Sequence, residues 1–230
     1  MSDYKNVNLN AGHRERMRQR YIANGLNGFQ PHEVLELLLF YAKPRCDTNK
    51  IAHELIHRFH TIAGVMNADI QELCEIDGIG MNTAIFLRLF PDVFKAYQMS
   101  KNSNKINFER KKDLKAYLAN LYIGSVKEQA YVLCFDANGQ MICVEPVGRG
   151  TSTTSSLEIR SIVEIALRNR SDSIVLVHNH PDGNSNPSSA DVFSTNSLIK
   201  ALNLLKIELL DHFIVGNRVT SMREIGRIMD

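Results

Sequence analysis

Two histidines and an aspartate stand at spacings that suit a metal ion. His178 and His180 follow the apolar run of residues 173–177, which is predicted to be a buried β-strand. In extended backbone, residues two positions apart point the same way, so both imidazoles can approach one ion. Asp191 follows at the start of a predicted helix and can supply an oxygen ligand. Three protein ligands leave the fourth tetrahedral position for water, an arrangement typical of catalytic zinc sites.

The same residues also have a structural interpretation. Two loop histidines can simply find hydrogen-bond partners, and Ser188 with Asp191 fits a helix N-cap followed by an acid at N3. The two interpretations do not exclude each other, because a helix cap can hold a ligand in place. Spacing alone leaves both open.

The elements that must position these residues alternate between strand and helix. Strands are predicted at residues 129–135, 140–147, 173–177, 207–215 and 218–221, and helices at residues 156–169 and 187–205. The tetrapeptide Asp136-Ala-Asn-Gly139 between the first two strands is a hairpin signal. The pattern predicts an α/β domain over residues 108–230.

The first part of the chain is predicted to be helical. Apolar residues recur at helical spacing in residues 31–41 and 49–59, with shorter helices at 62–66 and 70–74 and another ending at residue 97. Residues 99–107 are rich in Ser, Asn and Lys, which favours a linker. A helical domain is therefore expected over residues 1–98.

The composition is that of an ordinary globular protein. The 230 residues suffice for two modest domains, with 44% hydrophobic and 23% charged residues. No apolar run approaches the roughly 20 residues needed to span a bilayer, and the N-terminus lacks the apolar core of a signal peptide. We therefore expect a cytoplasmic protein with no membrane partner. The formal net charge of +2 does not by itself indicate a nucleic-acid partner.

The four cysteines are predicted to be free thiols. Cys46, Cys74, Cys134 and Cys143 form no C-x-x-C pair, which argues against a cysteine zinc knuckle. A disulfide between Cys134 and Cys143 is conceivable across the hairpin, but a cytoplasmic setting argues against it.

The spacing of the candidate ligands resembles a known motif. His178, His180, Ser188 and Asp191 match H-x-H-x7-S-x2-D, which is similar to the JAMM motif of MPN+ metalloproteases. The neighbouring sequences LVHNHPDG and LLDHFIVG resemble the RadC family more closely, and this similarity covers nearly the whole chain. It implies an MPN/JAMM domain of cytidine-deaminase-like α/β fold behind an N-terminal helix-hairpin-helix domain.

The resemblance also implies an activity. It implies a Zn2+ ion held by His178, His180 and Asp191, a peptide or protein substrate, and hydrolysis of a peptide or isopeptide bond. Ser188 would donate a hydrogen bond to the oxyanion of the tetrahedral intermediate. His212, in the similar stretch, is either an additional ligand or a hydrogen-bonding residue.

JAMM proteins also use an upstream glutamate as general base. The candidates are Glu128, Glu145, Glu158 and Glu164. In RadC-like sequences this glutamate stands a few residues before a Gly-Thr pair, and Glu145 stands in that position relative to Gly150-Thr151. The resemblance therefore favours Glu145. RadC-like sequences then carry His-Pro-Arg-Glu where this chain has Glu158-Ile-Arg-Ser161, so the resemblance does not extend to substrate contacts of that segment.

Gly78 and Gly80, followed by Thr83 and Ala84, resemble a helix-hairpin-helix motif. Glycines let the backbone approach a DNA phosphate, which the N–H groups at the next helix start can then bind. The alternative is a helical corner in which the glycines only make the turn. Residues 1–98 hold 11 Lys or Arg and 11 Asp or Glu, so the electrostatic affinity for DNA would be modest.

Three functions therefore remain open. The favoured one is a zinc-dependent metallopeptidase or isopeptidase. The second is a DNA-binding accessory protein in DNA repair or recombination, and the third is a metal-dependent nuclease that uses the same ion.

Overall fold

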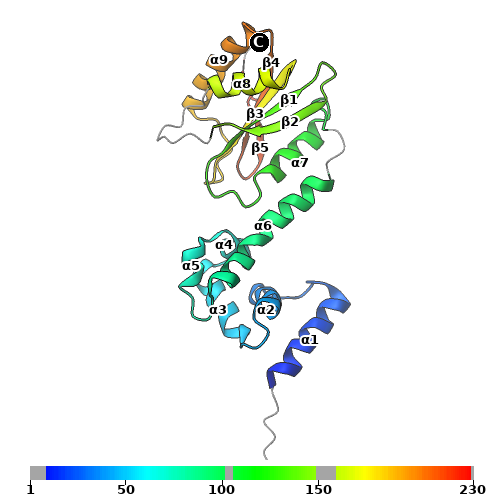
Figure 1. Ribbon diagram of the computed structural model, residues 1–230, viewed down its shortest axis with the longest axis vertical. Helices are drawn as coiled ribbons and strands as arrows, with labels where there is room; N and C mark the ends of the chain where they lie inside the picture. Colours follow the sequence, from blue (N-terminus) through cyan, green and yellow to red (C-terminus); the bar gives the residue numbers. More distant parts are fainter. Residues whose placement is uncertain (1–8, 102–105, 149–158, 229–230) are drawn as a thin grey trace, which may run out of the picture. The chain divides into compact units, whose positions relative to one another are not determined.

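The computed structural model describes residues 9–101, 106–148 and 159–228, and contacts divide the chain into two compact units (Figure 1). The first unit is Met1–Val93 and the second is Phe94–Asp230. The expected combination of an N-terminal helical region and a C-terminal α/β region is confirmed.

The first unit is built only from helices in its described residues. Its helices are α1 (Leu9–Asn24), α2 (Pro31–Ala42), α3 (Thr48–Phe59), α4 (Ile62–Asn67), α5 (Ile70–Cys74) and the first part of α6 (Met81–Lys101). Asp47, Thr61 and Asp69 cap α3, α4 and α5 by accepting backbone N–H groups. The unit's core includes Leu35, Leu39, Leu55, Leu73 and Leu87, all of which are fully buried. The helical pattern read from the sequence is therefore confirmed.

Helix α6 crosses the boundary that the sequence suggested. It continues to Lys101, so the first three residues of the expected linker 99–107 are helical, and the units divide between Val93 and Phe94. Residues 102–105 lie outside the described residues. Polar composition marks a region of low hydrophobicity but does not by itself end a helix. Among the described residues, no helix has both the length and the apolarity to cross a bilayer.

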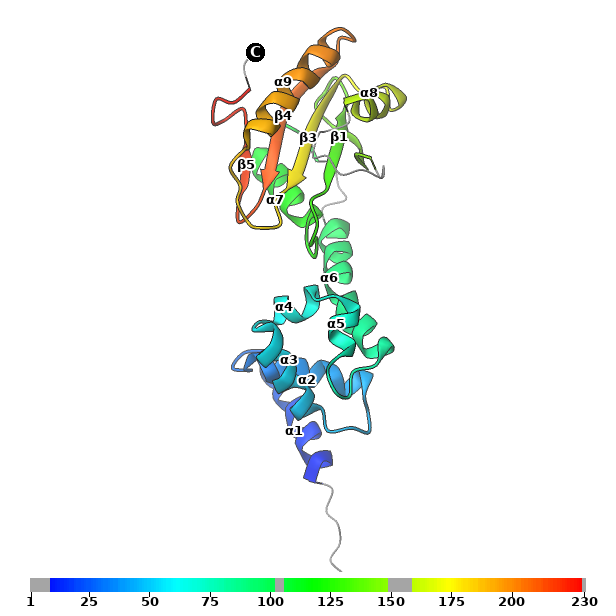
Figure 2. The ribbon, with the colours of Figure 1, turned by 90° about the vertical axis from the view of Figure 1, so that its left-hand side faces the viewer.

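The second unit contains a five-stranded mixed sheet (Figure 2). Its elements are α7 (Lys111–Leu121), β1 (Ala130–Phe135), β2 (Met141–Pro146), α8 (Ile159–Arg168), β3 (Ser173–Asn179), α9 (Ser189–Asn203), β4 (Glu208–Val215) and β5 (Val219–Ser221). The strand order is β2-β1-β3-β4-β5, with β3 and β4 parallel and the other neighbours antiparallel. The strands predicted from the sequence are all present.

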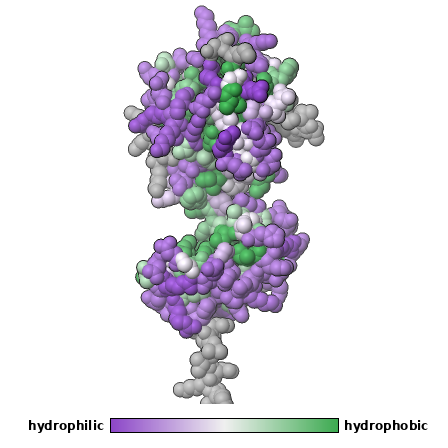
Figure 3. Space-filling model, turned by 180° about the vertical axis from the view of Figure 1, so that it is seen from behind, coloured by the Kyte–Doolittle hydropathy of each residue, from purple (hydrophilic) through white to green (hydrophobic). Residues whose placement is uncertain are grey.

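Helices cover both faces of this sheet, which explains the continuous apolar run of β3. Val175 and Val177 pack in the core formed with α7, whereas Ile174 and Leu176 pack in the core formed with α8 and α9. Hydrophilic side chains in turn cover much of the visible face of this unit (Figure 3). His178 continues the even-numbered series, so its side chain leaves the strand on the side of α8 and α9.

The cysteines are free thiols, as expected. Cys134 and Cys143 lie opposite each other in the β1–β2 pair. Burial raises the pKa of Cys143 to about 12 and also raises the pKa of Cys134. Both side chains are therefore protonated at neutral pH and poorly reactive.

Candidate metal centre

The imidazoles of His178 and His180 meet at the end of β3. His178 is the penultimate residue of the strand, and the N–H of His180 still donates to the carbonyl of Val215, which keeps the backbone extended. The two Nε2 atoms are 2.9 Å apart. Asp191 closes the group, with Oδ1 3.3 Å from Nε2 of His178 and Oδ2 3.8 Å from Nε2 of His180. The structure brings the three predicted ligands together.

Asp191 is held by the cap of α9. Ser188 is the N-cap residue, and its Oγ accepts from the N–H of Asp191 at 3.1 Å while its own N–H donates to Asp191 Oδ2 at 2.7 Å. The Ser188 hydroxyl also lies 2.7 Å from Oδ2 and donates to it. Both interpretations of Ser188 and Asp191 are thus compatible: the capping box is present, and it turns Oδ1 towards His178.

Glu128 reaches the same group from the segment before β1. One carboxylate oxygen of Glu128 and one ring nitrogen each from His178 and His180 all lie within 4.8 Å of one another. The strand register explains this position. Ala130 pairs with His178 in the antiparallel β1–β3 ladder, so the next pair on the same face is Glu128 with His180. Glu128 is exposed, whereas His178 is buried.

The Nδ1 atom of each histidine, on the side of the ring away from the shared centre, has a hydrogen-bond partner. The Nδ1–H group of His180 donates to the carbonyl of Asn184 at 2.8 Å. His178 Nδ1 lies 2.8 Å from Nε2 of His212, whose own Nδ1 lies 2.7 Å from the hydroxyl of Thr195. Both Nε2 atoms therefore face the shared centre.

Comparison with known proteins identifies the family of this chain. The family model described as "RadC-like JAB domain" matches residues 108–227. The chain belongs to the RadC family. A UPF0758 protein of Fusobacterium nucleatum subsp. nucleatum is 35% identical over 227 residues, which cover 95% of this chain and 98% of that relative. A UPF0758 protein of Chlorobaculum parvum is 33% identical over 202 residues, covering 88% and 90%.

RadC-like JAB domains belong to the JAMM-type metal-dependent hydrolases and typically bind a metal ion. The mixed sheet with helices on both faces is consistent with a JAB/MPN domain. The group formed by Glu128, His178 and His180 is the candidate metal site of this RadC chain.

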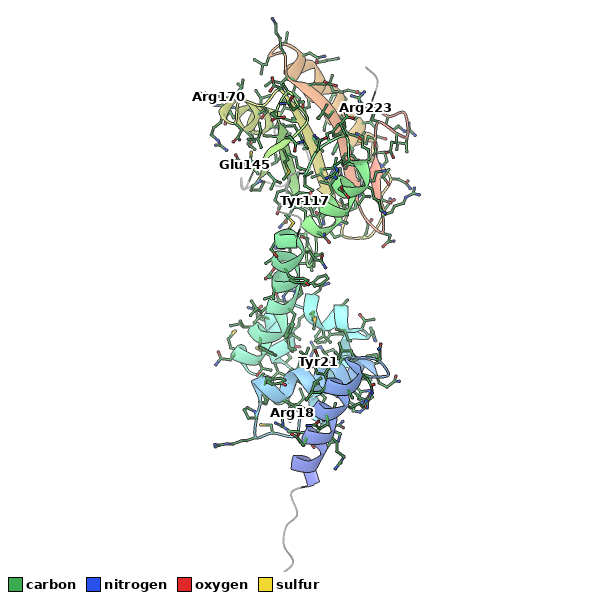
Figure 4. The ribbon with its side chains drawn as sticks, turned by 90° about the vertical axis from the view of Figure 1, so that its right-hand side faces the viewer. Arg18, Tyr21, Tyr117, Glu145, Arg170 and Arg223 are labelled. Atoms are coloured by element: carbon green, nitrogen blue, oxygen red, sulfur yellow. The ribbon has the colours of Figure 1, made fainter. Side chains whose placement is uncertain are left out.

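Glu145, the glutamate favoured by the RadC resemblance, lies on β2 and not beside the imidazoles. It pairs with Val132 on β2, and its carboxylate contacts Arg168 and accepts from Nδ2 of Asn169 at 2.7 Å. β2 is two strands away from β3, about 9–10 Å across the sheet. Figure 4 shows Glu145 on the opposite side of the unit from Arg223.

The other two glutamate candidates are not part of the group either. Glu164 lies on α8 and pairs with Arg160 one turn earlier. Glu158 lies outside the described residues, as does Thr151 of the Gly-Thr pair. Of the four candidates, Glu128 is the one that the described residues place at the centre.

The donor set fits a divalent cation. Burial lowers the pKa of His178 to about 4, an effect that Asp191 opposes and His180 reinforces. The imidazole is therefore neutral at neutral pH and can act as a ligand. Two imidazole nitrogens and a carboxylate oxygen are the ligand types of catalytic zinc sites. His178, His180 and Asp191 could hold such an ion, with Glu128 beside it.

A cavity of about 310 Å³ opens next to His180. Its lining comes from the end of α7, the loop after β3 and the β4–β5 turn, and includes Tyr122, Asn179, Gly183 and Arg218. The cavity touches one candidate ligand, His180, and its lining does not include Glu128, His178 or Asp191.

Gly78 and Gly80 lie between α5 and α6. Gly78 has φ +86°, and a Cβ atom there would lie 2.9 Å from Cδ1 of Ile51. Gly80 precedes α6, and a Cβ atom there would meet nothing within 4 Å. The turn itself therefore requires Gly78, whereas Gly80 leaves open space. DNA contact by this hairpin stays a prediction.

Proposed function

We propose that this RadC protein is a zinc-dependent hydrolase of peptide or isopeptide bonds. The observation that carries the proposal is the meeting of the Nε2 atoms of His178 and His180 with the carboxylate of Asp191, at 2.9–3.8 Å. The exposed carboxylate of Glu128 beside them supplies a candidate general base.

The zinc ion and the general base would have different tasks in the hydrolysis. Zinc bound by His178, His180 and Asp191 would polarise a carbonyl and lower the pKa of water from about 15.7 towards 7. Glu128 would accept a proton from the attacking water and return it to the leaving amine. Its exposure suits this role, because a base must reach both solvent and substrate. We propose Glu128 for this role in place of Glu145.

Ser188 has a proposed role in stabilising charge. Its hydroxyl donates to Asp191 Oδ2 in the capping box, at the edge of the group of ligands. By rotating about its side-chain bond, the same hydroxyl could donate to the oxygen of a substrate carbonyl as negative charge develops there. Ser188 would then both orient a ligand and stabilise the oxyanion.

Elemental analysis and hydrolysis assays test the proposal together. The full chain is expected to carry one zinc ion and to cleave members of a panel of peptide and isopeptide-linked substrates. Chelation should remove the activity, and added Zn2+ should restore it. Cleavage that is indifferent to chelation, or a chain that takes up no metal, would refute the proposal.

A second candidate function is DNA binding by the hairpin between α5 and α6. The observation that favours it is the open space at Gly80, immediately before the N-terminus of α6. A phosphate could approach the backbone N–H groups there without contacting bases. Such a contact would suit an accessory role in DNA repair or recombination.

DNA-binding and cleavage assays distinguish the alternatives. Affinity of the full chain for duplex or branched DNA should fall as salt rises, and absence of binding at low salt would end the idea. DNA cleavage that requires the metal would instead favour a nuclease.

A further inference from the structure

Two buried side chains, His212 and Thr195, connect the candidate ligand His178 to the candidate ligand Asp191. His178 Nδ1 lies 2.8 Å from His212 Nε2, and His212 Nδ1 lies 2.7 Å from Thr195 Oγ1. Thr195 Oγ1 lies 2.6 Å from the main-chain carbonyl of Asp191, one helical turn earlier in α9. His178 is 2% exposed, and His212 and Thr195 are 0% exposed, so water does not compete for these hydrogen bonds.

We call this chain of hydrogen bonds from His178 to Asp191 the relay. The main-chain carbonyl of Asp191 at its end determines which group donates and which accepts in each of its hydrogen bonds. A carbonyl only accepts, so the Thr195 hydroxyl donates to Asp191. The hydroxyl has one proton, so its oxygen must accept from the Nδ1–H group of His212. A neutral His212 then has a bare Nε2, which accepts from the Nδ1–H group of His178. His178 is left with an unprotonated Nε2 atom, the state that a metal ligand requires.

A main-chain carbonyl also determines the tautomer of His180, in this case through a single hydrogen bond. Its Nδ1–H group donates directly to the carbonyl of Asn184, which leaves its Nε2 atom bare as well. Two lone pairs then face each other across the 2.9 Å between the Nε2 atoms, beside the carboxylate of Asp191. A cation between these groups would be attracted by both lone pairs and by the carboxylate.

We propose that Thr195 and His212 are positioning residues that hold His178 in the tautomer that binds metal. This inference rests on the proposed metal site. Asp191 acts twice in it: its carboxylate is a ligand, and its main-chain carbonyl anchors the relay that prepares His178. The arrangement couples the start of α9 to β3 through His212 on β4.

Removing the Thr195 hydroxyl should release the relay. Without that acceptor, His212 can carry its proton on Nε2 and donate it to Nδ1 of His178. His178 must then carry its own proton on Nε2, where it blocks the metal. Loss of such an outer hydrogen bond typically costs 10- to 100-fold in metal affinity.

The chain offers matched variants for the test. Thr195→Val removes the hydroxyl at nearly constant volume, and Thr195→Ser retains it. Thr220→Val makes the same change at a buried threonine whose Oγ1 has no hydrogen-bond partner among the described residues. Zinc dissociation constants of the four full-length proteins, wild type included, would be measured by competition with a chelator. Thermal unfolding of the metal-free proteins would confirm that each is folded.

The proposal expects a 10- to 100-fold higher Kd for Thr195→Val and a change below threefold for Thr195→Ser and Thr220→Val. A Thr195→Val protein that is folded and binds zinc as tightly as the wild type would overturn it. A second readout needs no metal: 15N NMR of the wild type should show His178 protonated on Nδ1. Protonation on Nε2 would refute the inference even if no protein binds zinc, whereas absent zinc binding alone would refute only the proposed function.

Discussion

Glu128 lies across from His180, two positions along the antiparallel register from the pair formed by Ala130 and His178. This relationship brings the carboxylate of Glu128 to the candidate metal site, although 50 residues separate Glu128 from His178 in the sequence. Glu145 has a different position from Glu128, because its carboxylate contacts the side chains of Arg168 and Asn169.

Replacing these two glutamates by glutamine should therefore have different consequences. Glu128→Gln removes the proposed base and should lower kcat about 10²- to 10⁴-fold, while the protein keeps its zinc. Glu145→Gln is the matched control, since it removes only the charge that faces Arg168, and its kcat should change less than threefold. Peptide hydrolysis and zinc content of both variants decide the matter. Full activity of Glu128→Gln beside an inactive Glu145→Gln would reverse the assignment.

The difference between these glutamates shows what the sequence can predict. The apolar run of β3 and the hairpin signal are local patterns, and they correctly predicted the strands. The pairing of β1 with β3 is a contact between segments about 45 residues apart, and no local pattern fixes its register. The number of residues before a Gly-Thr pair does not contain that register, and Glu145, which this spacing favours, lies two strands away from β3.

Non-local contacts also explain what else the sequence left open. The spacing of His178, His180 and Asp191 indicated the ligands because a strand end and a helix start have regular geometry. The role of His212 depends on the parallel pairing of Leu176 with His212 and on a turn of α9 packed above it. Its two interpretations, ligand or hydrogen-bonding residue, could not be separated without that pairing.

The cap of α9 should matter for stability and for activity separately. Ser188→Ala removes the cap and should lower the free energy of unfolding by about 1 kcal/mol. Thr61→Ala, at the cap of α4, is the matched control and should lower it by a similar amount. Only Ser188→Ala should also lower kcat, because its hydroxyl lies at the metal group. Equal loss of kcat in both variants at matched stability would show that Ser188 acts only as a cap.

The metal-free protein should lose stability as the solution becomes acidic. Burial lowers the pKa of His178 from 6.5 to about 4 and lowers that of His212 well below 6.5. Between pH 6.5 and 4, the unfolded chain therefore binds more protons than the folded protein, so the free energy of unfolding falls as pH falls. Urea unfolding with chelator at several pH values measures this slope. His178→Gln removes one of the two groups and should show a shallower slope; an unchanged slope would contradict the assignment.

The turn before α6 should tolerate substitution at one glycine and not at the other. Gly78→Ala places a Cβ atom 2.9 Å from Cδ1 of Ile51 in a backbone with φ +86°. Left-handed backbone alone costs a non-glycine residue roughly 1–2 kcal/mol, so the free energy of unfolding should fall by at least that amount. Gly80→Ala meets no atom within 4 Å and should change it by less than about 0.5 kcal/mol. Urea unfolding of both variants measures the difference, and equal losses would show that the turn constrains both positions alike.

If DNA binds at this hairpin, Gly80→Ala should also weaken binding without unfolding the domain, because the added methyl group occupies the space that a phosphate would need.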